Sequence, residues 1–306
     1  MFRMRASACA GWLFLFSVLL FSCNNKGKKA TGEAESPTRG TISISVDESL
    51  KPVVEQELKV FDSSFPNAHI HESYLTEGEC FDRFFKDSVR LIVVTRDLTP
   101  SEKALCTQNG IVTKSLPIAM DAIALIVHPG SPDSLMTLGQ LKAVLSGTFA
   151  RPYTVVFDNE KSGTVRYILD SLIPGQKLPS NLFAVQHNEA VIDYVAQHEQ
   201  ALGILGVTHV YDPADGSGAG IFRKGIQVVA LRDDSTGDFY QPYQAYIALK
   251  QYPLTRPVYF ISRENWQGPA TGFANFLCGE RGQLLFNKAR LVPLRVPLTI
   301  REAELK

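Results

Sequence analysis

Along residues 41–116, short segments with the apolar spacing of a strand alternate with segments that have the apolar spacing of a helix. Residues 41–46 alternate apolar and polar side chains and include β-branched residues, which is typical of a strand. Residues 49–61 repeat apolar side chains at helical spacing and predict a helix with one apolar face. Further strands are expected at 68–72, 90–94 and 111–116, and further helices at 78–87 and 100–108. Strands that alternate with helices predict a mainly parallel sheet covered on both faces.

The same alternation continues through the rest of the chain. We expect strands at 121–128, 153–157, 202–207, 226–231, 244–249 and 258–261. We expect helices at 137–145, 162–172, 190–197, 271–278 and 281–288. Residues 40–306 are numerous enough to form two lobes with a hydrophobic core each. The predicted fold class is therefore α/β.

The N-terminus has the pattern of a processing signal. Arg3 and Arg5 precede a nearly unbroken apolar run at residues 11–21, which is too short for a comfortable transmembrane helix and has the flanks of a secretory signal. The run ends before Cys23 in a sequence that resembles a bacterial lipobox. We therefore expect residues 1–22 to be a signal peptide and Cys23 to carry lipid chains that anchor the protein stably. The alternative is an ordinary signal peptide followed by an incidental cysteine.

Composition narrows the possible partners. Residues 23–39 hold no large apolar side chain and cannot offset their ordering entropy, so we expect a flexible tether. The chain has 31 basic and 31 acidic residues, and removal of residues 1–22 takes away two arginines, which leaves 29 against 31, or a net charge of about −2. No nucleic-acid partner is expected from this balance, and local groups must hold any bound anion.

Three cysteines follow the signal, at Cys80, Cys106 and Cys278. An exported protein can form one disulfide from them, and the sequence leaves the pairing open. Neither their spacing nor the scattered histidines resemble a zinc site, so no metal ion and no cofactor are expected.

Ser162, Gly163 and Thr164 follow one predicted strand and open the next predicted helix. A helix N-terminus presents free N–H groups and a partial positive charge, hydroxyls add donors, and glycine lets the backbone approach a ligand closely. This arrangement suits a small anion. The alternative is a plain helix cap, where serine and threonine are favoured in any case.

The order of several short motifs along the chain matches that of a known family. The motifs lie at residues 118–147, 161–164, 252–257, 282–283 and 291–294, and the matched region covers nearly all of residues 40–295. Together they resemble the phosphate-binding solute receptors of ABC importers. The resemblance implies a two-lobed periplasmic-binding-protein-like fold of type II, each lobe a mainly parallel sheet flanked by helices. Residues 40–117 with 230–306 would form one lobe and residues 118–229 the other, with the ligand in the cleft between them.

The resemblance also implies a role without catalysis. A member of this family would capture phosphate or a similar oxyanion and deliver it to an ABC permease in the inner membrane. We therefore expect an exported, monomeric lipoprotein of the cell envelope, held at the periplasmic face by its lipid anchor, with no catalytic residue.

Thr95 and Arg96 follow the buried strand at residues 90–94 and match the family's turn at its third strand. The resemblance implies that both contact the ligand, and Arg96 can make a bidentate contact with an oxyanion. The alternative is an exposed arginine paired with Asp97.

Asp47, Glu48 and Ser49 follow the first strand, where the family usually has glycine and small hydroxyl residues. The resemblance places all three at the ligand. A carboxylate repels an oxyanion unless it accepts a proton from it, so Asp47 would favour protonated phosphate over sulfate. The alternative is that these acids only complement the dipole of the helix that they open.

Asp158 is a second departure, because the family often has an arginine four positions before the serine that is Ser162 here. Lys161 or Arg166 would then supply the positive charge, and Arg166 joins the predicted ligand-binding residues.

Three other functions stay open at this point. The protein could bind a different ligand or serve a sensor instead of a transporter, or it could be a structural envelope lipoprotein with a degenerate cleft. A hydrolase is disfavoured because the sequence has no GxSxG, HExxH or Walker motif. The adjacent Lys161 does not face Ser162 on a helix, so it is a poor candidate for a catalytic base.

Overall fold

The computed structural model describes residues 34–176, 181–215 and 220–295. Its strands are β1 Arg39–Asp47, β2 Asn67–Leu75, β3 Leu91–Val94, β4 Lys114–Val127, β5 Leu135–Met136, β6 Thr154–Phe157, β7 Leu182–Ala184, β8 Ala201–Gly206, β9 Gln227–Val228, β10 Ala230–Arg232, β11 Phe239–Tyr240, β12 Thr255–Ser262 and β13 Val292–Pro293. Its α-helices are α1 Lys51–Ser64, α2 Glu77–Phe85, α3 Pro100–Gln108, α4 Leu138–Leu145, α5 Gly163–Leu172, α6 Asn188–Gln197, α7 Gln244–Ala248, α8 Pro269–Cys278 and α9 Glu280–Lys288. Two 3-10 helices, η1 Glu48–Leu50 and η2 Val207–His209, complete the described elements.

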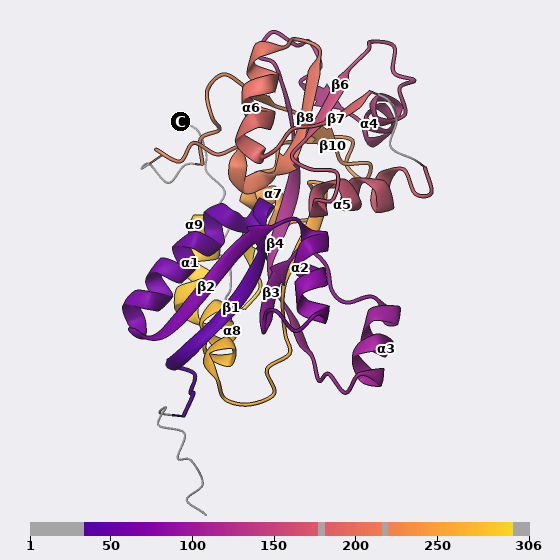
Figure 1. The fold of residues 1–306 in the computed structure, drawn as a ribbon. Helices are drawn as coiled ribbons and strands as arrows, with labels where there is room; N and C mark the ends of the chain where they lie inside the picture. Colours follow the sequence, from indigo (N-terminus) through magenta and orange to yellow (C-terminus); the bar gives the residue numbers. More distant parts are fainter. Residues whose placement is uncertain (1–33, 177–180, 216–219, 296–306) are drawn as a thin grey trace, which may run out of the picture. The chain divides into compact units, whose positions relative to one another are not determined.

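Most of the described strands form a ten-stranded sheet in the order β2-β1-β3-β12-β4-β8-β6-β7, and β9 and β13 also pair with β4 (Figure 1). Strand β1 pairs in parallel with β2 and β3, and β6 pairs in parallel with β7 and β8. We call β1–β3 the β1 end of the sheet and β6–β8 the β6 end. A second sheet of three strands has the order β11-β10-β5. This architecture confirms the predicted α/β class.

Strands β4 and β12 join the two ends of the sheet and run antiparallel to each other. The first part of β4, through Ala122, pairs with β12, and its last part, from Ile123, pairs with β8. Because one long strand belongs to both ends, the side chains near its middle lie where the two ends meet. The predicted division of the chain into lobes at residues 117 and 230 stays a prediction.

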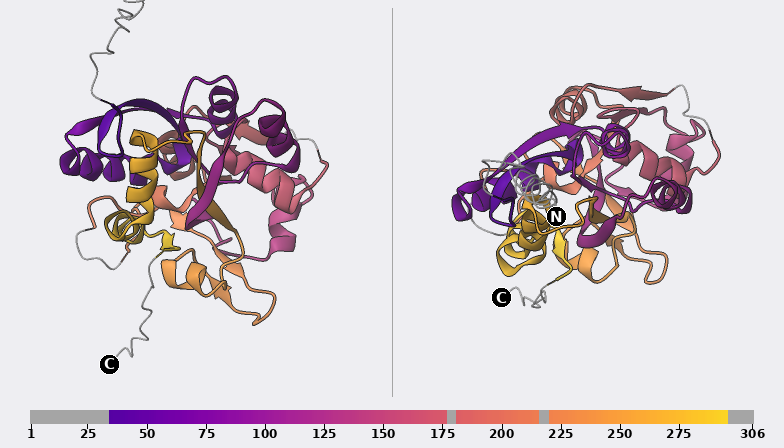
Figure 2. Two further views of the ribbon diagram at one scale, coloured as in Figure 1. Left: turned by 90° about the horizontal axis from the view of Figure 1, so that it is seen from below. Right: turned by 60° about the horizontal axis from the view of Figure 1, so that its bottom comes forward.

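Helices cover both faces of the β1 end, as the apolar strand β3 requires. Leu91 and Val93 belong to the main core with residues of α1, α8 and α9, whereas Ile92 and Val94 pack with Phe84 in a second core under α2. Successive side chains of a strand point to opposite faces, so a strand with four consecutive apolar residues needs cover on both. Helices α8 and α9, from the C-terminal part of the chain, lie beside α1 from the N-terminal part (Figure 2).

Capping boxes define where three of the helices begin. The Thr76, Thr99 and Thr137 hydroxyls accept from the N–H three residues on, and the side chains at those positions return a bond to the N-cap N–H. Two otherwise unpaired backbone N–H groups are satisfied in each case. The first of these boxes fixes the start of α2, and with it the position of Glu77.

Several predicted element boundaries are wrong. Residues 244–249, predicted as a strand, form the short helix α7, because a short apolar run carries too little periodicity to separate the two states. The separate strands predicted at 111–116 and 121–128 are one strand, β4. Pro117 lies inside β4 beside a β-bulge, where a residue without an N–H group is tolerated. The strand predicted at 226–231 is divided between β9 and β10.

The cysteines Cys80, Cys106 and Cys278 are free thiols. Within the described ranges, no helix is both long enough and apolar enough to cross a bilayer. The predicted signal peptide at residues 1–22 and the predicted lipidation site at Cys23 lie outside the described residues, as does most of the predicted tether.

Candidate functional site

Ser162, Gly163 and Thr164 lie where the chain leaves β6 and enters α5, as the sequence predicts. Ser162 is the N-cap of α5, and its Oγ accepts a hydrogen bond of 3.2 Å from the N–H of Val165. Ser162 and Thr164 are both buried. The serine therefore serves as a helix cap, but the helix start that it caps lies inside the protein instead of at its surface.

Gly163 brings the backbone of α5 against side chains from the β1 end of the sheet. A Cβ atom at this position would lie 2.5 Å from Asp47 Oδ2, 2.7 Å from Thr95 Oγ1 and 3.1 Å from Glu77 Oε1. No real side chain fits at the first two distances, so this close approach requires glycine. The two ends of the sheet therefore meet at Gly163.

Arg256, which the sequence analysis does not select, lies at the centre of this meeting point. Its side chain is fully buried, and its Nε donates to Asp121 Oδ2 at 2.8 Å. Its terminal nitrogens donate to Ser49 Oγ at 3.0 Å and to Thr164 Oγ1 at 3.5 Å. Asp121 and Arg256 are direct partners in the pairing of β4 with β12. A charged residue among the apolar residues of each of these two strands is the signal in the sequence that could have revealed the pair.

Glu77 forms a second link between the two ends. Its Oε1 accepts from the Thr95 N–H at 3.0 Å and from the Thr95 hydroxyl at 2.7 Å, and its Oε2 accepts from Nε of Arg166 in α5. Burial alone would raise the pKa of Glu77, but the charge of Arg166 and its hydrogen bond outweigh burial and lower that pKa. Glu77 is therefore a buried ionised carboxylate. The sequence analysis misses it because its partners Thr95 and Arg166 lie far away in the sequence.

The two predicted arginines have different surroundings. Arg166 reaches the meeting point, where it contacts Glu77 and lies 3.4 Å from Thr95 Oγ1. Arg96 instead makes a bidentate pair with Glu102 at 2.7 and 2.9 Å and stacks on the ring of Phe81. Its remaining Nε lies 3.9 Å from Glu77 Oε2, at the edge of the group.

Asp47 and Asp158 approach the same place from opposite ends of the sheet. Asp47 Oδ1 caps η1 by accepting from the Ser49 N–H at 2.9 Å, whereas Asp47 Oδ2 and Asp158 Oδ1 receive no hydrogen bond within the described part of the chain. Burial and the neighbouring charge of Glu77 raise the pKa of Asp47 to about 7. Burial also raises the pKa of Asp158. Both side chains therefore offer acceptor oxygens, or a proton, in a dry environment.

Glu48 does not join this group fully. It is half-buried beside Asp47, and no side-chain hydrogen bond to it is described. Burial and the nearby charge of Asp158 raise its pKa. Of the predicted ligand-binding residues, the structure gathers Asp47, Ser49, Thr95, Ser162, Gly163, Thr164 and Arg166, and leaves Glu48 and Arg96 at the margin.

A cavity of about 440 Å³ opens beside the meeting point, between α2 and the start of α5. Its wall combines positive and negative side chains with the N-cap of α5. The residues that line it are Glu77, Gly78, Glu79, Asp82, Arg96, Glu160, Lys161, Ser162, Val165, Arg166, Leu169 and Asp170. This cavity gives solvent, and therefore a ligand, a route to Glu77 and Arg166.

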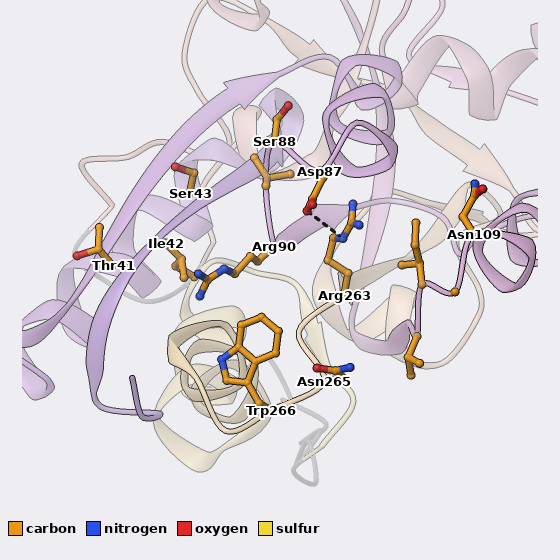
Figure 3. Close-up of a pocket in the computed structure, with 14 residues that line it drawn as sticks. Thr41, Ile42, Ser43, Asp87, Ser88, Arg90, Asn109, Arg263, Asn265 and Trp266 are labelled. Atoms are coloured by element: carbon orange, nitrogen blue, oxygen red, sulfur yellow. Dashed lines mark ion pairs between the residues drawn. The ribbon is translucent and has the colours of Figure 1, made fainter. Parts of the chain in front are cut away.

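A second hollow of about 600 Å³ lies on the β1 end of the sheet and includes none of the predicted site residues (Figure 3). Its arginines already have partners. Arg90 pairs with Glu35 at 2.7 Å and stacks on Trp266, and Arg263 pairs with Asp87 at 3.3 Å. The arginines of the meeting point are paired as well, Arg166 with Glu77 and Arg256 with Asp121. The hollow is set apart because none of the predicted site residues lines it.

Two other kinds of chemistry, metal binding and nucleophilic catalysis, would each need a particular arrangement of side chains. Among the described residues, no group of three or more histidine, cysteine, aspartate or glutamate side chains has an arrangement that could hold a metal ion. Ser162 Oγ accepts the helix-cap hydrogen bond from Val165, and the Ser162 hydroxyl donates to the carboxyl group of Asp158. The geometry instead offers hydroxyl and guanidinium donors beside buried acceptors.

Comparison with known proteins assigns the fold to a family. Residues 31–281 match the PBP superfamily domain, and the chain belongs to this family. The phosphate-binding protein PstS of Staphylococcus saprophyticus is 22% identical over 85% of this chain and 81% of its own length. A Clostridium perfringens structure with bound phosphate is 23% identical, with a TM-score of 0.70, and the match covers 83% of this chain and all of that one. An ABC-type phosphate transport receptor from Vibrio cholerae is 20% identical, with a TM-score of 0.63 and the same coverage. At these identities, the solved structures establish the shared fold.

Proposed function

We propose that this protein is a solute-binding protein that captures phosphate, or a similar oxyanion, between the two ends of its sheet for ABC-type import. The observation that carries the proposal is the convergence of hydroxyl groups from Ser49, Thr95 and Thr164 with the guanidinium groups of Arg166 and Arg256. Hydroxyls and guanidinium groups are the donors that replace water around an oxyanion. The phosphate-related names of the relatives support the same ligand class.

The acidic residues of the site restrict which oxyanion can bind. Asp47 and Asp158 each hold a buried oxygen that no described group satisfies, and a fully ionised anion would face these carboxylates without a hydrogen bond. An oxyanion that carries a proton donates that hydrogen bond itself. Phosphate and arsenate carry a proton at neutral pH, whereas sulfate does not. The site therefore favours phosphate. Arg166 and Arg256 supply the positive charge that the family's arginine would give at position 158.

The proposed mechanism is closure of two lobes. Residues 40–117 with 230–306 would form one lobe, residues 118–229 would form the other, and β4 and β12 would be the connections that bend. The close approach at Gly163 supports contact of the two lobes in a closed state. The proposal includes no catalytic step, because the donors only position and stabilise a small anion.

The cellular setting is also a proposal. A signal peptide at residues 1–22 and a lipid at Cys23 would export the protein and anchor a monomer to the membrane through the tether at 23–39, within reach of an ABC permease. Labelled palmitate should enter the full-length chain in cells, and Cys23→Ser should abolish that label. Equal labelling of both proteins would exclude Cys23 as the lipidation site.

The function is tested by removal of the donors at the start of α5. Each hydrogen bond to a charged group is worth about 1.5–3 kcal/mol, so Ser162→Ala with Thr164→Ala should weaken phosphate binding at least about a hundredfold. The matched control is Ser171→Ala, on the exposed side of the same helix. Calorimetric titration of the full-length chain in detergent measures both. Unchanged phosphate affinity in the double variant would contradict the proposed site.

A further inference from the structure

The carboxylate of Glu77 occupies the donors that an oxyanion at this site would use. The backbone N–H of Thr95 donates to it at 3.0 Å, the hydroxyl of Thr95 donates at 2.7 Å, and the guanidinium of Arg166 donates through Nε. A backbone amide, a hydroxyl and a guanidinium that converge on two oxygens form a typical oxyanion-binding set. Here a side chain of the protein fills that set.

The same carboxylate connects the two ends of the sheet. Thr95 follows β3 at the β1 end, and Arg166 lies in the first turn of α5, next to β6. Glu77 itself begins α2, which packs on β1 and β3. Only 3% of the Glu77 side chain is exposed, against 28% of the Arg166 side chain, so water reaches this ion pair mainly from the side of the arginine. A buried ion pair that spans the meeting point opposes separation of the two ends.

Glu77 also has a second partner, towards which it can turn. Arg96 Nε lies 3.9 Å from Glu77 Oε2 and lines the same cavity. The guanidinium of Arg96 is held in place by Glu102 and by the ring of Phe81. A carboxylate displaced from Thr95 would therefore keep a cationic neighbour, which lowers the cost of displacement.

We propose that Glu77 is a built-in competitor of the anionic ligand, which holds the two ends of the sheet together without ligand and must leave Thr95 and Arg166 before an oxyanion can use them. This inference rests on the proposed function for the identity of the ligand. It makes Glu77 a determinant of affinity, because every ligand must replace a carboxylate that is already bound.

The test measures opening and binding separately in the full-length chain in detergent. Hydrogen exchange followed by mass spectrometry reports opening through the amides of residues 94–97 and 162–166 without any ligand. Calorimetric titration with inorganic phosphate reports binding. The variants are Glu77→Gln, which keeps the shape and removes the charge, and Arg166→Gln, which removes the opposite partner. The matched control is Asp82→Asn, because Asp82 is exposed on the same helix and lines the same cavity.

The two variants are expected to act alike on opening and oppositely on binding. Loss of a charge-assisted hydrogen bond should speed exchange of both segments about tenfold or more in Glu77→Gln and in Arg166→Gln. Phosphate should bind about tenfold more tightly to Glu77→Gln and at least about tenfold more weakly to Arg166→Gln. Asp82→Asn should match the unsubstituted protein in both measurements. A merely structural role for Glu77 would move binding in the same direction in both variants.

Two results would overturn the inference. Exchange in Glu77→Gln at the unsubstituted rate would show that Glu77 does not hold the ends together. Weaker phosphate binding by Glu77→Gln would show that Glu77 helps to hold the ligand instead of competing with it. If neither the unsubstituted chain nor any variant binds phosphate, the proposed function fails, and the exchange rates alone still decide whether Glu77 links the two ends.

Discussion

At the scale of single residues, three buried carboxyl groups are the main feature to explain. Asp47, Asp158 and Glu57 are all buried, and each has at least one oxygen that no hydrogen bond reaches in the described part of the chain. Burial disfavours the charged form, so each of these side chains has a raised pKa. Ionised Asp47 and Asp158 would need a hydrogen bond to offset this burial, and a ligand that carries a proton can donate one.

Glu57 in α1 provides a test of that physics away from the site. Burial raises its pKa to about 9, well above the value of about 4.3 in an unfolded chain. The folded state therefore binds the extra proton between these two values, and the free energy of unfolding falls by about 1.4 kcal/mol per pH unit as the pH rises through that window. In Glu57→Gln this loss is absent. We expect the variant and the original protein to be similarly stable at pH 4.5 and the variant to be clearly more stable at pH 8.

Urea unfolding at the two pH values measures this difference. The control is Glu55→Gln, because Glu55 is on the same helix but is exposed and pairs with Lys59. A stability difference that does not change with pH would mean that Glu57 is ionised in the folded protein.

Single residues were predictable from the sequence where their role depends on neighbours in the chain. Ser162 and Gly163 carry a local helix-start signal, and the structure places them at the start of α5. Arg256 and Glu77 were missed because their partners lie far away in the sequence, at Asp121 and at Arg166. No local spacing encodes such a contact, and only the register of β4 with β12 brings the first pair together.

At the scale of elements, the start of α5 is the contact on which closure depends. A methyl group at position 163 would overlap Asp47 Oδ2 and Thr95 Oγ1, which both lie on the other side of the meeting point. Gly163→Ala should therefore weaken phosphate binding at least about tenfold, since the two ends cannot approach as closely. The free energy of unfolding should fall as well, by about 1–3 kcal/mol, because the methyl group overpacks a buried contact of the folded state.

Gly78→Ala is the matched control for this prediction. Gly78 also lies in the first turn of a helix at the cavity, but a Cβ there would meet only the Lys161 carbonyl oxygen, at an ordinary 3.9 Å. Calorimetric titration and urea unfolding of both variants separate binding from stability. Full phosphate affinity in Gly163→Ala would show that the bound state lacks this close contact.

The pairing of β4 with β12 depends on the ion pair of Asp121 and Arg256. Both side chains are about 1% exposed, so Arg256→Met leaves an uncompensated buried carboxylate and should lower the free energy of unfolding by about 3–5 kcal/mol. Adding Asp121→Leu should restore much of that loss, because an apolar pair of similar volume replaces the ions. The exposed pair of Lys59 and Glu55 is the control, and Lys59→Met should cost less than about 1 kcal/mol.

A double-mutant cycle in urea measures the coupling between Asp121 and Arg256. Additive effects of the two substitutions would show that the pair contributes nothing to the connection between the two ends.

Elements were predictable in type more often than in extent. The exchange of strands and helices at the β1 end is confirmed, because hydrophobic periodicity alone specifies it. The strand predicted at 244–249 is wrong, because over so short a length the apolar residues fit the spacing of a strand and that of a helix equally well. The continuity of β4 was hidden by Pro117, which usually ends a strand but here sits beside a bulge.

At the scale of the whole molecule, the order of motifs was more informative than any one of them. The resemblance covers nearly all of residues 40–295, and the match to the PBP superfamily domain at residues 31–281 confirms the periplasmic-binding-protein-like family. The sequence does not show how closely the two ends approach, since that depends on contacts between distant segments at Gly163, Glu77 and Arg256. The central claim concerns the buried carboxyl groups of Asp47 and Asp158 at the site. Because of them, the site selects an oxyanion that carries a proton.

The most direct test of this claim is a calorimetric titration of the full-length chain at pH 7 with phosphate, arsenate, sulfate and molybdate. We predict saturable binding of phosphate and arsenate. Binding of sulfate and molybdate should be at least about a hundredfold weaker, because an anion without a proton leaves the buried oxygens of Asp47 and Asp158 unpaired. Equal affinity for sulfate and phosphate, or no heat from any of the four, would contradict the account.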